Sequence, residues 1–160
     1  MYFDKKLKII FMLNTSLILF FGSLNADSNK NKCEGENYKM WNDCIGSLAI
    51  NGTAYVGEFK NGLYNGKGTF TYSDGATYRG GFLNGKESGM GEFNCWEHGS
   101  NFKGEFSNGE KHGFGVYKYP DGVIYEGFWM YGKRHGKGTL KYVDGKTKNG
   151  NFEDDYFIDK

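Results

Sequence analysis

The strongest constraint on this chain is a sequence unit that occurs four times in tandem between Tyr55 and Thr147. The copies begin at Tyr55, Tyr78, Phe102 and Tyr125, so successive copies are spaced by 23, 24 and 23 residues. A fixed period of this length is typical of stacked supersecondary units that each depend on their neighbours for stability. The sequence therefore predicts an elongated array of similar units.

Each copy contains two runs of alternating residue type. In the first run of the first copy, Tyr55, Gly57 and Phe59 share one face and mostly polar residues share the other, as the two-residue period of a strand requires. Asn-Gly follows the first run and Asp-Gly the second run in most copies, and both dipeptides close hairpins. We therefore predict β-hairpins in one essentially single-layered antiparallel sheet.

The glycines of these strands need a structural reason, because glycine inside a strand costs about 0.5 to 1 kcal/mol relative to alanine. One glycine follows each leading aromatic residue by two positions and lies on the same face. We expect aromatic rings from adjacent hairpins to stack over these glycines and build a core without a second layer. The predicted core positions are Tyr55, Gly57, Phe59, Tyr78, Gly80, Phe82, Phe102, Gly104, Phe106, Tyr125, Gly127 and Trp129.

The full pattern, Tyr-x-Gly-x-Phe/Trp-x-x-Gly-x-x-x-Gly-x-Gly, resembles the MORN repeat (membrane occupation and recognition nexus). The resemblance covers nearly all of the chain after its N-terminal segment. It implies an all-β fold, an elongated and twisted antiparallel sheet of tandem hairpins. It also implies use as a scaffold or binding surface, with phospholipid binding proposed for some family members.

Residues 1–26 have the features of a secretory signal peptide. Lys5, Lys6 and Lys8 precede an apolar stretch, and the small residue Ala26 offers a cleavage point. An uncleaved membrane anchor is the alternative, although the apolar stretch is short and interrupted by polar residues. We predict an exported chain, periplasmic or secreted, that is cleaved near Ala26.

Removal of residues 1–26 leaves 17 Lys and Arg against 18 Asp and Glu, a net charge of about −1. Proteins that bind nucleic acid normally carry a basic excess, so we expect no nucleic-acid partner. Binding to anionic phospholipid loses support for the same reason, but a local basic strip could still contact a membrane surface.

The leader, residues 27–43, contains Cys33 and Trp41, and Cys44 opens a half repeat at residues 44–54. A half repeat forms a cap whose open edge needs cover, and an exported protein can hold a covering loop with a disulfide. We predict a disulfide between Cys33 and Cys44, since a metal site would have too few ligands nearby. The leader resembles the entry to MORN arrays in exported bacterial proteins.

The third cysteine, Cys95, holds the template position that Tyr72 holds in the first copy, which predicts a buried and inert thiol. The alternative is a small thiol or hydrolytic enzyme that uses Cys95 with His98 or His112. His112 and His135 occupy the same place in successive copies, so the repeat template explains them without chemistry. We expect no catalytic residue, no metal site and no cofactor.

A candidate contact surface lies on the outer face of the third and fourth copies. We expect an odd-length loop around Asp121-Gly122, as in a three-residue loop with a bulge. Pairing of Tyr119 with Tyr125 would then place Val116 opposite Phe128. The apolar Phe128 and Met130 replace mostly polar residues at the equivalent positions. The predicted patch for a protein partner or a second copy of the chain is Val116, Phe128, Met130 and Tyr131.

The sequence thus predicts a non-enzymatic exported scaffold or binding module, with phospholipid binding as the alternative. The expected organisation is a signal peptide, a leader, a MORN array over 44–160 and, within it, a partial repeat whose tail covers the last edge. The segments are 1–26, 27–43, the half repeat 44–54, the full repeats 55–77, 78–101, 102–124 and 125–147, and the cap 148–160.

Overall fold

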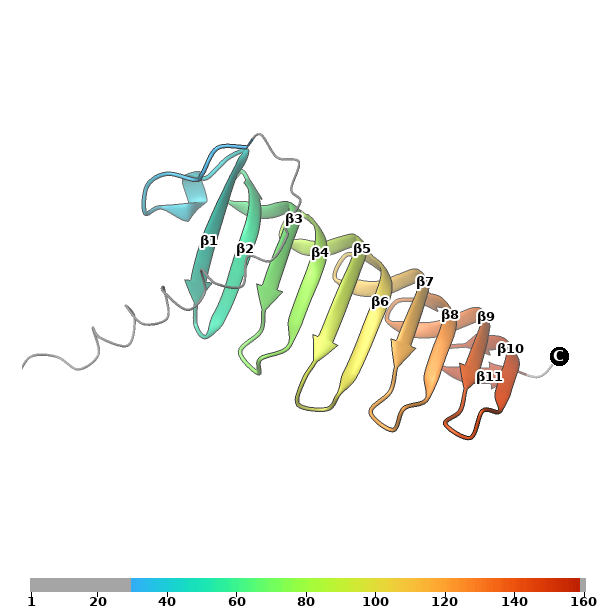
Figure 1. Cartoon of the computed structure of the whole chain (residues 1–160). Helices are drawn as coiled ribbons and strands as arrows, with labels where there is room; N and C mark the ends of the chain where they lie inside the picture. Colours follow the sequence, from blue (N-terminus) through green and yellow to red (C-terminus); the bar gives the residue numbers. More distant parts are fainter. Residues whose placement is uncertain (1–29, 159–160) are drawn as a thin grey trace, which may run out of the picture.

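The computed structural model describes residues 30–158, which form one elongated antiparallel sheet of 11 strands in sequential order. This confirms the predicted all-β architecture. Figure 1 shows the strands side by side along the long axis, with the leader at one end and the C-terminal hairpin at the other. The elements are η2 (Tyr38–Met40), β1 (Cys44–Ile50), β2 (Thr53–Lys60), β3 (Leu63–Thr71), β4 (Thr77–Leu83), β5 (Lys86–Cys95), β6 (Ser100–Ser107), β7 (Glu110–Lys118), β8 (Ile124–Met130), β9 (Lys133–Lys141), β10 (Thr147–Glu153) and β11 (Tyr156–Ile158).

Two kinds of turn recur along the sheet. Within a repeat, two residues with positive φ close the hairpin, as at Asn61 (52°) and Gly62 (72°) between β2 and β3. Between the first and second repeats the loop has three residues, because the Tyr72 N–H donates to the Ala76 carbonyl at 2.8 Å. The second and third repeats are instead joined by the four residues between the paired Cys95 and Ser100. Tyr119 and Val123 form the same hydrogen bond, so the predicted odd-length loop at Asp121-Gly122 is confirmed.

The core lies on one face of the sheet, over the paired glycines. The leading rings of the four repeats are fully buried: Tyr55, Tyr78, Phe102 and Tyr125. A Cβ added at Gly68 would lie 2.5 Å from the ring of Tyr55. Glycine is therefore required where strand β3 passes beneath that ring.

One detail of the predicted core is wrong: the ring over each glycine pair belongs to the same hairpin. Tyr55 lies over Gly57 of its own strand and Gly68 of the paired strand, because side chains two residues apart share a face. The adjacent hairpin contributes Phe82, which packs edge-on against Tyr55 with the ring centroids 5.0 Å apart. Such edge contacts join one repeat to the next.

The buried tyrosines also fix the backbone at the bulge of their own strand. Tyr55 donates its hydroxyl hydrogen to the Glu58 carbonyl at 2.9 Å, and Tyr125 donates to the Phe128 carbonyl at 3.0 Å. Burial raises the pKa of Tyr125 to about 12. The third repeat begins with Phe102 and lacks this hydrogen bond.

The leader closes the N-terminal end of the sheet. Cys33 and Cys44 form the predicted disulfide, with their Cα atoms 5.0 Å apart. The Cys33 N–H donates to the Ile45 carbonyl at 2.8 Å, so the leader pairs with the free edge of β1. Trp41 packs edge-on against Phe59 at 4.9 Å and covers the last ring of the core.

The tail closes the opposite end. Strand β11 pairs antiparallel with β10, and the Phe157 ring lies over Gly150 and 5.3 Å from the Phe152 ring. Asp155 in the connecting turn pairs with Arg134 at 3.1 Å, so this acidic residue is bound to the preceding repeat. The predicted signal peptide, residues 1–26, lies outside the described residues.

Candidate functional site

The aromatic face of the sheet is occupied by its own side chains. Lys111 extends across the rings of the third and fourth repeats, with Nζ 4.5 Å from the Tyr117 ring centroid and 4.7 Å from that of Trp129. Burial lowers the pKa of Lys111 from its ordinary value. Arg134 lies in the same way, 5.3 Å from the Phe152 ring. This face therefore serves as the core, and the outer face is the better candidate for binding.

The structure corrects the predicted strand register at the candidate patch. Tyr117, and not Tyr119, pairs with Tyr125, so Val116 lies opposite Glu126 instead of Phe128. The reason is that Tyr119 and Val123 close a loop of three residues, whereas a pair of Tyr119 and Tyr125 would enclose five residues. Val116 consequently does not belong to an apolar cluster with Phe128.

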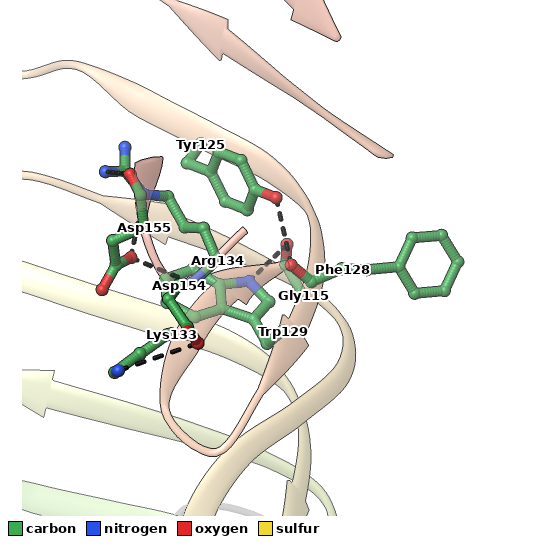
Figure 2. Close-up of polar contacts among 8 residues, drawn as sticks. All are labelled: Gly115, Tyr125, Phe128, Trp129, Lys133, Arg134, Asp154 and Asp155. Carbon is green, nitrogen blue, oxygen red and sulfur yellow. Dashed lines mark hydrogen bonds and ion pairs between the residues drawn. The ribbon is translucent and has the colours of Figure 1, made fainter. Parts of the chain in front are cut away.

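Phe114 takes the place that was predicted for Val116. It pairs with Phe128 across β7 and β8, and the two rings meet edge to face with centroids 5.8 Å apart. Phe114 is 44% exposed and Phe128 is 50% exposed, so the pair presents both rings to solvent. Figure 2 shows the Phe128 side chain pointing away from Tyr125 and Trp129, although its backbone carbonyl accepts the Tyr125 hydroxyl.

Tyr131, three residues after Phe128, adds a third exposed ring. It is 70% exposed and occupies the first position of the turn between β8 and β9, with φ of 51°. Asparagine holds that position in the first three repeats, and a bulky residue with positive φ carries strain of about 1 kcal/mol. The Tyr131 ring lies 6.2 Å from that of His112 on β7. We define the aromatic patch as Phe114, Phe128, Met130 and Tyr131.

A shallow groove of about 490 Å³ continues from the aromatic patch across β9 and β10. Polar side chains of Glu126, Lys137, Lys141 and Asn151 line it beside Phe128. Lys141 pairs with Glu126 at 2.6 Å, so part of its positive charge is neutralised within the groove. The groove and the patch form a mixed surface with an apolar end and a polar end.

The thiol prediction needs a correction, because Cys95 is only half-buried and lies outside the core cluster. It ends β5 opposite Ser100, next to the long turn that contains the exposed His98. Over the described part of the chain, no group of three or more His, Cys, Asp or Glu side chains could hold a metal ion. Within residues 30–158, no helix is long and apolar enough to cross a membrane.

Comparison with protein families identifies the architecture. The MORN repeat model matches the chain four times, at residues 55–77, 78–95, 102–124 and 125–147. These matches cover more than half of the chain, which belongs to the MORN-repeat family. The matches begin after the leader, so the resemblance to exported bacterial arrays stays a prediction.

MORN repeats occur in binding and scaffold modules and are generally non-catalytic. A comparison with curated protein sequences gives no significant match. The family therefore defines the kind of module, and any specific contact must be inferred from this chain's own surface.

Proposed function

We propose that this chain is a non-enzymatic binding module that contacts another protein, or a second copy of itself, through the aromatic patch. The observation that carries the proposal is the exposed ring pair of Phe114 and Phe128 on the polar face of the sheet. Exposed aromatic residues and methionine are the side chains that protein interfaces favour at their centres. In the first repeat the equivalent positions hold Lys67 and Glu58, which suit a solvated surface.

The strained backbone at Tyr131 supports the same surface. The two-residue turn would be more stable with asparagine, so the tyrosine ring is retained at a cost in stability. Strained positions of this kind cluster at functional sites. The ring lies beside Met130 at the end of β8, where it extends the patch.

We also propose that the chain is exported. The disulfide between Cys33 and Cys44 supports this, because disulfides persist mainly in oxidising compartments. The basic and apolar sequence of residues 1–26 supports it independently. Phospholipid binding has less support, since the net charge after residue 26 is about −1.

The double variant Phe128→Glu and Met130→Lys tests the patch. We expect partner capture from the native source, or self-association in solution, to fall by at least about tenfold, because central interface side chains contribute 2 kcal/mol or more. Leu83→Lys is the matched control, since Leu83 is an exposed apolar residue at the template position of Met130. Equal capture and equal oligomeric state of the folded double variant and the wild type would exclude the patch.

Tyr131→Asn separates stability from binding. We expect the free energy of unfolding in urea to rise by about 1 kcal/mol, because asparagine tolerates positive φ. We expect binding to weaken at the same time, because the exposed ring is lost. A variant that is less stable than the wild type would show that the tyrosine backbone is not strained.

A further inference from the structure

Two of the four repeats contain a carboxylate that binds the backbone of the second strand. In the first repeat, Glu58 Oε1 accepts the Lys67 N–H at 2.9 Å. In the third repeat, Glu105 Oε1 accepts the Phe114 N–H at 3.4 Å. We call the space occupied by these carboxylates, next to the amide and the glycine that precedes it, the carboxylate slot.

The glycine before each amide makes room for the carboxylate. Gly66 and Gly113 both have positive φ, and a Cβ added at either would lie 2.6 Å from the carboxyl carbon of Glu58 or Glu105. A side chain at this glycine would therefore displace the carboxylate. The slot is thus a property of the repeat backbone, and a glutamate of the same repeat fills it twice.

The second repeat has the slot without the glutamate. Gly81 holds the position of Glu58, so no side chain is present there to reach the Met90 amide. Gly89 has positive φ like Gly66, but a Cβ added at Gly89 would meet no atom within 4 Å. In the fourth repeat the side chain of Phe128 borders the slot, with its Cβ 3.7 Å from a Cβ added at Gly136. The slot of the second repeat is therefore the open one.

The surroundings of this open slot carry an excess of positive charge, with Glu92 directly across from both Arg79 and Lys103 in the sheet. It lies in a groove of about 670 Å³ lined by Lys67, Arg79, Lys103, Met90 and Glu92, among others. The amide of Asn101 donates to Glu92 at 3.1 Å. Among residues 30–158, no carboxylate lies within 4 Å of the charged nitrogens of Lys67, Arg79 or Lys103. In the groove beside the aromatic patch, by contrast, Lys141 pairs with Glu126.

We propose that the open slot of the second repeat binds a carboxylate from an extended acidic segment of a protein, with Met90 N–H, Arg79, Lys67 and Lys103 as its partners. A carboxylate is favoured over other anions because the carboxylates of Glu58 and Glu105 accept the equivalent backbone N–H in the first and third repeats. The basic side chains that line the groove also favour further acidic side chains in the same segment. This site is separate from the aromatic patch, and neither proposal depends on the other.

The test is an amide chemical-shift titration of the ¹⁵N-labelled full chain with N-acetyl-hexaglutamate amide, and with N-acetyl-hexaglutamine amide as the neutral control. We expect hexaglutamate to shift the Met90 and Gly89 amides, and hexaglutamine to leave them unchanged. The Phe114 amide should shift far less, because Glu105 occupies its slot. Arg79→Gln should weaken the hexaglutamate affinity by about threefold, as expected for one exposed charge pair.

Glu105→Ala is the gain-of-site control. It removes the internal carboxylate of the third repeat, so the Phe114 amide should become responsive to hexaglutamate. Shifts of similar size in all repeats would overturn the proposal, because they would indicate diffuse attraction to basic side chains. Larger Met90 shifts with inorganic phosphate or phosphatidylglycerol vesicles than with hexaglutamate would also overturn it in favour of a phosphate ligand.

Discussion

Replacement of Gly138 by alanine is expected to lower the free energy of unfolding by about 3 kcal/mol. A Cβ at this position would lie 2.5 Å from two carbon atoms of the Tyr125 ring, which is fully buried. The ring has no room to move, because Trp129 and Phe152 contact it with centroids 5.2 and 5.0 Å away. Overpacking of a closed core typically costs about 1 to 3 kcal/mol.

The sign of this effect is informative. Strand propensity alone predicts that alanine stabilises the strand by about 0.5 to 1 kcal/mol. Urea unfolding measures the difference in the free energy of unfolding between the wild type and Gly138→Ala. Thr139→Ala is the control, because Thr139 is the next residue and lies on the outer face. We expect the control to change stability by less than about 0.5 kcal/mol. A neutral or stabilising Gly138→Ala would show that the ring does not lie on the glycine backbone.

Trp129→Ala is expected to cost about 3 to 5 kcal/mol, the range for large aromatic residues in a core. Trp129 is 4% exposed and lies 5.2 Å from both Phe102 and Tyr125, so it joins the third repeat to the fourth. Its Nε1–H donates to the Gly115 carbonyl at 3.3 Å (Figure 2). The substitution also removes the ring beneath the Lys111 ammonium.

Hydrogen exchange should show which strands are destabilised by Trp129→Ala. Since each repeat contacts mainly its neighbours, we expect strands β6 to β10 to lose protection while β1 to β3 keep most of theirs. Tyr142→Ala is the control, because Tyr142 is 40% exposed and lies outside the core cluster. Equal loss of protection along the whole sheet would indicate one cooperative core instead of a linear array.

The sequence was sufficient to predict the hairpins because their signals are local. Alternation of residues and Asn-Gly turns act within a few positions, and the period of the repeat extends them over the whole sheet. The Cys33–Cys44 pair was likewise predictable from its place at an edge that needed cover. The hairpin that supplies the ring over each glycine pair could not be predicted. Alternation assigns each residue to a face of the sheet, but it does not give the direction in which a ring extends along that face.

The register between repeats was harder to predict for a related reason. A shift of two residues leaves every side chain on its own face, so the alternating pattern cannot distinguish Tyr117 from Tyr119 as the partner of Tyr125. Phe114 was missed as a consequence. A signal was present in the sequence. Phe114 is aromatic, whereas the other three repeats have Lys67, Met90 and Lys137 at the same position.

The carboxylate slot could not be predicted from strand patterns. It depends on a side chain that bonds to the backbone of the next strand across a bulge between Gly57 and Phe59. Comparison of the repeats nonetheless contains the clue, because Glu58 and Glu105 are replaced by Gly81 and Phe128. The two replacements coincide with the repeats whose outer face carries the grooves.

Site-specific photocrosslinking is the most direct test of whether the outer face of the last two repeats is the binding surface. Benzoylphenylalanine would replace Phe128 and, as the control, Ile50, an exposed apolar residue near the opposite end of the sheet. Irradiation in the cells that naturally make the chain should give one discrete crosslinked species from position 128 and none from position 50. No discrete product at position 128, or the same products at both positions, would contradict binding through this face.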